Sequence, residues 1–185
     1  AIRWAASEGI VTGSEGKFRP DDAVTRQELA VMLVRALGYN DIAGLAQDLP
    51  MPFTDVTTSP GYITMAYDLG LITGTTATTF SPNNTCTRAQ ILTFLWRAVG
   101  SPKATIANPF TDVKTTDYFY DAALWAYGKG MVSGTVFAGT TPCTREATVV
   151  YLWKNAGSPA TAVSSALKDV PASAPYAQAV AWAEA

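Results

Sequence analysis

The segment TRQELAVMLVRALG, residues 25–38, indicates the fold class most directly. The hydroxyl of Thr25 can accept a hydrogen bond from a backbone N–H, and Glu28 can reciprocate three residues later, which is a capping box at a helix start. Apolar residues then follow at helical spacing: Leu29, Met32, Leu33 and Leu37. Because this stretch lacks the sustained alternation typical of a strand, it predicts an amphipathic helix with one face in the core.

The same helix start occurs three times in the chain. Thr-Arg pairs stand at 25–26, 87–88 and 144–145, so the steps between them are 62 and 57 residues. Gln90 can complete a second capping box, whereas Ala147 cannot complete a third. We therefore expect the helix that begins after Thr144 to have the weakest N-terminal cap.

Three further signals accompany each Thr-Arg pair in a constant order. They are an Asp-Val pair (Asp55, Asp112, Asp169), a glycine that closes an alanine-rich segment (Gly9, Gly70, Gly130) and a loop ending in phenylalanine (Phe18, Phe80, Phe137). A glycine followed by an apolar residue is typical of a left-handed helix C-cap. Each unit thus reads as helix, loop, helix, and the chain is predicted to be an all-α fold of tandem repeats.

Composition restricts the function. The chain has 48% hydrophobic residues, a formal charge of -2 and no histidine. No basic surface is available to collect nucleic acid or anionic lipid, and no apolar run approaches the roughly 20 residues of a membrane span. Without histidine or a pair of catalytic carboxylates, we expect no enzyme, no metal site and no cofactor.

Cysteines and the repeated aspartates are interpreted as structural. Cys86 and Cys143 each stand where the first unit carries Val24, so two free buried thiols are favoured over one bridge. The acids of the Asp-Val pairs occur singly, and a single aspartate at a fixed loop position is typical of a turn or helix cap.

These four signals, repeated in constant order, resemble the surface-layer homology (SLH) family over nearly the whole chain. The resemblance implies three tandem modules around a shared pseudo-threefold helical core, with ligand grooves between neighbouring modules. It also implies an extracellular location at the bacterial cell surface or S-layer. There, such modules anchor proteins non-covalently to secondary cell-wall polysaccharides that frequently carry pyruvate ketals.

Module boundaries follow from the repeat. They are 1–50 for an N-terminally truncated module 1, 51–107 for module 2, 108–164 for module 3 and 165–185 for the opening segment of an incomplete further module. The partial ends fit a trimmed piece of a longer protein. Alternatively, the 167–170 segment completes module 1, in the same molecule or in a neighbouring one, which leaves domain-swapped self-association open.

The arginines of the Thr-Arg pairs are the first candidate ligand residues. Arg26, Arg88 and Arg145 each occupy the first position of a helix, where the macrodipole disfavours a cation. Unpaired N–H groups of that turn together with a guanidinium could receive a carboxylate. The alternative is that each arginine pairs with an acid of a neighbouring module, such as those of the Asp-Val pairs. The family resemblance assigns these arginines to the pyruvyl group.

Aromatic residues and glycines complete the candidate site. Trp4, Trp125 and Trp182 are taken as equivalent, with Tyr67 in the second unit; Trp4 and Trp125 are candidate sugar-stacking residues, although core packing explains them at least as well. Three glycines could let backbone N–H groups approach a ligand, and simple turn geometry explains them equally: Gly13, Gly74 and Gly134.

The sequence therefore predicts a non-catalytic module that binds an anionic, pyruvylated cell-wall polysaccharide. A structural module with degenerate grooves, which makes lattice contacts and binds no glycan, is the alternative. Both readings agree on a cell-surface protein and differ in the partner.

Overall fold

The computed structural model describes residues 9–161 and 165–185. Within these ranges the chain forms helices and isolated bridges but no strand, so the all-α prediction is confirmed. The helices are α1 (Arg26–Ala36), α2 (Asn40–Leu45), α3 (Pro60–Asp68), α4 (Arg88–Ala98), α5 (Tyr120–Gly128), α6 (Arg145–Asn155) and α7 (Ala177–Glu184). None of the helices described is long and apolar enough to cross a membrane.

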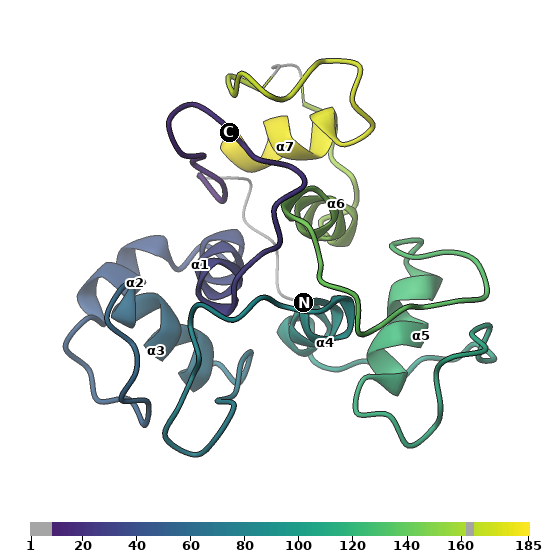
Figure 1. The fold of residues 1–185 in the computed structure, drawn as a ribbon, viewed down its shortest axis with the longest axis horizontal. Coiled ribbons are helices and arrows are strands. Elements are labelled where there is room, and N and C mark those ends of the chain that lie inside the picture. The colour runs from purple at the N-terminus through teal and green to yellow at the C-terminus, as the bar shows by residue number, and fades with distance from the viewer. Residues whose placement is uncertain (1–8, 162–164) are drawn as a thin grey trace.

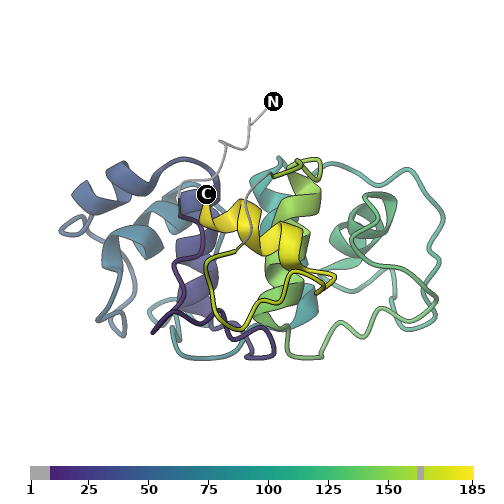
Figure 2. The same cartoon turned by 90° about the horizontal axis from the view of Figure 1, so that it is seen from above.

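Three lobes surround a central group of helices (Figure 1). The helices that begin with the Thr-Arg pairs, α1, α4 and α6, form the centre, and each packs against the first helix of the following unit: α3, α5 and α7 respectively. Figure 2 shows the same lobes side by side from above. Each lobe therefore combines helices from two successive sequence units.

A ring of backbone hydrogen bonds closes the centre. The N–H of Val24 donates to Cys143 O at 3.0 Å, that of Cys143 to Cys86 O at 2.9 Å, and that of Cys86 to Val24 O at 2.8 Å. The three equivalent residues thus define the pseudo-threefold axis. Both cysteines are buried and free, as expected, and burial raises the pKa of the Cys86 thiol to about 12.

Local capping explains where the helices start and stop. Thr25 with Glu28 and Thr87 with Gln90 form complete capping boxes, whereas the Thr144 hydroxyl only accepts from Ala147 N. The third cap is one-sided, as the sequence predicts. At the end of α3, Gly70 has φ +69°; its N–H donates to Tyr67 O and that of Leu71 to Ala66 O, which is a Schellman cap.

The tail completes the first module within the molecule. The carboxylate of Asp169 accepts from the N–H of Phe18 at 2.6 Å and of Arg19 at 2.7 Å. In addition, Val11 N donates to Ala183 O at 3.0 Å, just as Ile72 N donates to Ala66 O. Helix α7 therefore occupies, beside α6, the place that α3 occupies beside α1.

Candidate functional site

The three Thr-Arg arginines make one contact in common. Each guanidinium donates to the carbonyl of the phenylalanine that ends the loop of a neighbouring unit. The bonds are Arg26 Nε to Phe80 O at 2.8 Å, Arg88 Nη1 to Phe137 O at 2.7 Å, and Arg145 Nε to Phe18 O at 2.8 Å. A first role of these side chains is thus to join successive units around the axis.

The expected free N–H groups at the helix starts are not found. Arg26 N donates to Asn84 O, Arg88 N to Thr141 O and Arg145 N to Asp22 O. The next N–H of each helix also donates to a loop carbonyl, and the third donates to the cap threonine. That part of the sequence argument is wrong, because a neighbouring unit satisfies these donors; any anion would have to be held by side chains.

The acids of the Asp-Val pairs hold the phenylalanine loops and do not pair with the arginines. Each carboxylate accepts two consecutive backbone N–H groups: Phe80 and Ser81 for Asp55, Phe137 and Ala138 for Asp112, Phe18 and Arg19 for Asp169. The first-named bonds lower the pKa of Asp55 and Asp112. For Asp169, partial burial opposes the shift, but the two backbone bonds still lower its pKa. The structural interpretation of these acids is confirmed.

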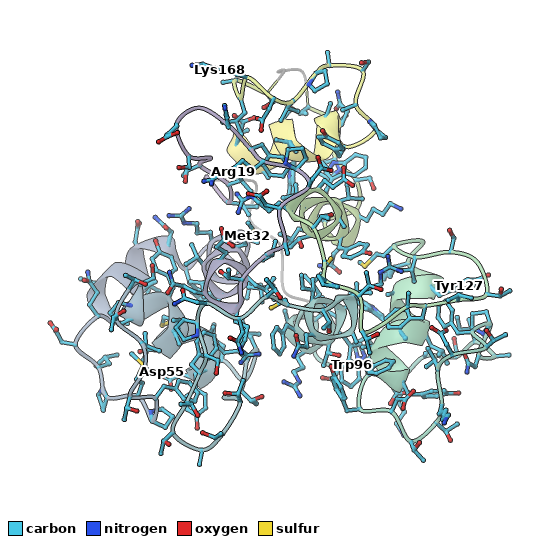
Figure 3. All side chains as sticks on the ribbon, in the orientation of Figure 1. Arg19, Met32, Asp55, Trp96, Tyr127 and Lys168 are labelled. Carbon is cyan, nitrogen blue, oxygen red and sulfur yellow. The ribbon has the colours of Figure 1, made fainter. Side chains whose placement is uncertain are left out.

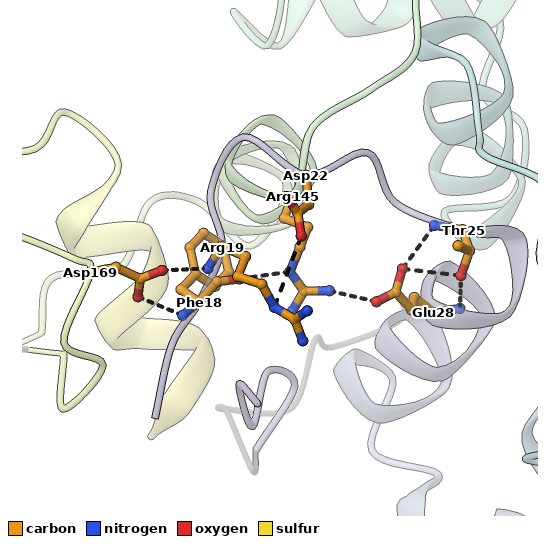
Figure 4. A network of polar contacts seen from close by, with 7 residues as sticks. All are labelled: Phe18, Arg19, Asp22, Thr25, Glu28, Arg145 and Asp169. Carbon is orange, nitrogen blue, oxygen red and sulfur yellow. Dashed lines mark hydrogen bonds and ion pairs between the residues drawn. The ribbon is translucent and has the colours of Figure 1, made fainter. Parts of the chain in front are cut away.

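Arg145 is the arginine of the three that pairs with a carboxylate in the structure. Its Nη1 lies 2.9 Å from Oε1 of Glu28, across the boundary between α6 and α1. The other oxygen of Glu28 accepts from the N–H and the hydroxyl of Thr25 at 2.9 and 3.0 Å. Figure 4 shows this network continuing through Phe18 and Arg19 to Asp169. One carboxylate therefore serves a helix cap and an arginine at once.

A cavity of about 260 Å³ lies beside this pair and is called the Arg145 cavity below. Three of its lining residues are cationic: Arg19, Arg35 and Arg145. The remaining lining residues are Ile10, Val11, Thr12, Gly13, Ser14, Gln27, Glu28, Val31, Met32 and Ser59. Figure 3 shows Arg19 and Met32 near the centre of the molecule, between two lobes. Three guanidiniums and one carboxylate thus line the cavity, and a second carboxylate, that of Asp22, lies 3.9 Å from Arg19 Nε without lining it. The cavity therefore has a net positive lining, although the whole chain is acidic.

Arg35 is a cavity residue that the sequence argument missed. It lies in the last turn of α1, where its Nη1 donates to Gly9 O at 3.1 Å and its guanidinium carbon lies 5.5 Å from the centre of the Tyr62 ring. Its Nε is buried and has no hydrogen-bond partner. Helical spacing from Glu28 could have placed Arg35 on the same face, because seven residues are about two turns.

Aromatic side chains stand at the equivalent places beside Arg26 and Arg88. Arg26 is 5% exposed; its guanidinium carbon lies 4.7 Å from the Phe80 ring centre and 5.8 Å from that of Phe94, and its Nη2 donates to Thr73 O. Beside Arg88 stands Tyr151, whose pKa burial raises to about 12. Phe94 and Tyr151 occupy the helix position that Met32 occupies in α1.

Of the candidate aromatic residues, the described one, Trp125, does not line the Arg145 cavity. Trp125 lines a different pocket, formed with the 103–106 linker, and Trp4 lies outside the described residues. Tyr67 is not the counterpart of Trp125: it packs edge-on against Phe53 as Tyr127 packs against Phe110, and Met65 holds the place of Trp125. The predicted equivalence of Tyr67 and Trp125 is wrong, because the two helices were aligned two residues out of register.

The candidate glycines have three different surroundings. Gly13 lines the Arg145 cavity, and a Cβ there would lie 2.6 Å from a Leu167 methyl group. At Gly74 a Cβ would lie 2.3 Å from Thr76 O, so packing alone requires glycine. Gly134 has φ +86° and open space around it, which is turn geometry. Gly13 is thus the member of this set that lies at the candidate site.

The comparisons agree with the repeat. The family model of the S-layer homology domain matches residues 1–30, 52–92 and 109–148. These matches cover more than half of the chain, so the protein belongs to the S-layer homology family. As a member of this family, the chain is a cell-surface anchoring module with an extracellular location.

The chain is similar to parts of much longer proteins. It is 39% identical over 87 residues to a "Cell surface protein" of Thermoanaerobacter kivui, covering 45% of this chain and 11% of that protein. It is 34% identical over 99 residues to an "Endoglucanase" of Bacillus sp. (52% and 10%), and 34% identical over 96 residues to a "Surface layer protein" of Brevibacillus choshinensis (50% and 8%). The chain therefore spans about a tenth of the length of the relatives it matches.

Proposed function

We propose that the chain anchors a protein to the bacterial cell wall by binding an acidic, pyruvylated polysaccharide in the Arg145 cavity. The observation that carries this proposal is the gathering of three arginines around one cavity on an otherwise acidic chain. Guanidinium groups bind carboxylates through paired N–H donors, which supplies both energy and orientation. Family membership supports a cell-wall partner.

The other cavity residues suit a sugar that carries a ketal. A pyruvyl ketal has a carboxylate and a methyl group on one carbon. In the cavity, Met32 and Val31 offer apolar surface close to Arg145, so both substituents of that carbon can find a partner. Hydroxyl and amide groups at Thr12, Ser14 and Gln27 line the same cavity and can bond the sugar hydroxyls.

Calorimetry and sedimentation with purified wall material test the proposal. We expect Arg145→Ala to weaken binding of a pyruvylated disaccharide at least tenfold, and mild acid removal of the ketals from the wall to abolish co-sedimentation of the native chain. Arg97→Ala is the matched control, because Arg97 holds in α4 the position of Arg35 in α1 and does not line the cavity.

Two results contradict the proposal. One is full affinity of the Arg145→Ala variant for the disaccharide, since its guanidinium is the proposed receptor. The other is equal binding to walls with and without ketals, which would leave anchoring in place but remove the pyruvyl group as its basis.

A further inference from the structure

The linker between α1 and α3 carries a short helix and three exposed aliphatic side chains. Helix α2 belongs to the linker between α1 and α3, and the described linkers after α4 and α6 form no helix. The linker that contains α2 is longer than the next one, which accounts for part of the difference between the Thr-Arg spacings of 62 and 57 residues. The exposed aliphatic residues are Ile42 and Leu45 of α2 and Leu49 just after it, which are 48%, 85% and 52% exposed. These three residues are called the α2 ridge.

The α2 ridge is held firmly on the lobe. A Cβ added at Gly61 of α3 would lie 1.9 Å from Ala43 O, so the backbones of the two helices are in direct contact. Tyr62 Oη also donates to Asn40 Oδ1 at 2.6 Å. Leu45, at 85% exposed on this fixed support, contributes nothing to the core, and apolar residues grouped on a surface are candidates for an interaction site.

A complementary surface lies on a different lobe. The linker after α4 and the end of α5 enclose a pocket of about 210 Å³, called the α5 pocket. Its apolar lining includes Ile106, Leu124 and Trp125, and its two charged lining residues are Lys103 and Lys129. A smaller apolar cavity, of about 150 Å³, suffices to take up a benzene molecule, so the α5 pocket can receive an aliphatic side chain.

The charges of the two surfaces are opposite. Residues 38–52 around the α2 ridge contain Asp41 and Asp48 and no lysine or arginine. The α5 pocket has two lysines; Asp121 lies one turn earlier on α5 and does not line it. We propose that the α2 ridge of one molecule binds the α5 pocket of a second copy, with Leu45 as the apolar anchor and the aspartates facing the lysines.

The contact is heterologous, because the two surfaces are different and lie in different lobes, on either side of the central helices (Figure 1). A head-to-tail contact can extend from copy to copy as an open chain or close into a ring. The surfaces are small, so each contact is weak in solution and gains strength when many copies are held side by side. It does not involve the Arg145 cavity.

Sedimentation velocity on the whole chain tests the contact. We expect the native chain to associate as its concentration rises, whereas Leu45→Glu alone and the double variant K103E/K129E alone stay monomeric. An equimolar mixture of the two variants regains association that stops at pairs, because it contains one intact ridge and one intact pocket. Circular dichroism and the Tm should match the native chain, since these side chains are exposed.

Three outcomes would overturn the proposal. A native chain that stays monomeric up to millimolar concentration has no such contact. Association of K103E/K129E by itself indicates ridge against ridge rather than ridge against pocket. A mixture that stays monomeric while each variant is folded shows that the two surfaces do not bind each other.

Discussion

Arg26 and Arg145 begin equivalent helices and reach the same kind of partner, yet their surroundings differ. Both donate from Nε to a loop phenylalanine carbonyl at 2.8 Å. Both guanidiniums also lie over the ring of that phenylalanine, Phe80 for Arg26 and Phe18 for Arg145. A second ring, Phe94, then lies beside Arg26, whereas Arg145 lines a cavity together with Glu28 and Met32. The comparison teaches that the repeated arginine is first a structural link, and that its neighbours on the next core helix decide whether it can also meet a ligand.

The largest expected effect is on folding. Arg26→Ala removes a buried guanidinium and leaves the carbonyls of Phe80 and Thr73 without its two hydrogen bonds. Since unpaired buried acceptors and lost charge-assisted bonds are costly, the free energy of unfolding should fall by about 3 kcal/mol. Urea denaturation measures this. A free energy of unfolding equal to that of the native chain would contradict the structural role of Arg26.

Closing the open cavity should weaken binding. Met32→Phe places in α1 the residue that α4 carries at the same position, Phe94. We expect at least tenfold weaker binding of a pyruvylated disaccharide, about 1.4 kcal/mol or more, by calorimetry. Met65→Phe on α3 serves as the control, because Met65 does not line the cavity. Undiminished affinity of the Met32→Phe variant would place the ligand elsewhere.

Freeing Arg145 from its protein carboxylate should strengthen binding. Glu28→Gln keeps the capping box, since Gln90 forms the same box in α4, and removes the charge that competes with an acidic ligand. We expect roughly threefold tighter binding, about 0.7 kcal/mol. Glu146→Gln is the control, because it removes a first-turn acid of α6 that does not line the cavity. Weaker binding by Glu28→Gln would mean that Glu28 helps to hold the ligand.

The smallest expected effect is a loss of folding stability in acid, to which all three lobes contribute. Asp55, Asp112 and Asp169 have pKa values lowered by backbone hydrogen bonds. Their contribution to stability is therefore complete at neutral pH and is lost as the pH falls below the ordinary carboxyl value of about 3.9 and through the lowered values. Thermal unfolding between pH 7 and pH 2 measures it.

The matched variant carries asparagine at the three aspartate positions. It should be less stable at neutral pH and show a shallower loss of stability in acid. An acid response as steep as that of the native chain would assign the loss to other carboxyl groups.

The sequence by itself determined the repeat, the helix starts and stops, and the equivalence of Val24 with the two cysteines. These features depend on hydrogen bonds and apolar contacts within a few residues, such as Thr25 with Glu28, and local chemistry of that kind can be read from spacing. It also selected the arginines, although the unpaired N–H groups that it predicted beside them are absent, as at Arg26, whose N–H donates to Asn84 O.

Only the tertiary structure decided which side chains surround each arginine and that Arg145 lines a cavity. The residues that open or close each place, Met32, Phe94 and Tyr151, belong to a different unit from the arginine that they face. Likewise, Asp169 meets Phe18 across 151 residues of sequence. Packing around the pseudo-threefold axis brings these groups together, and no spacing within one unit encodes that meeting.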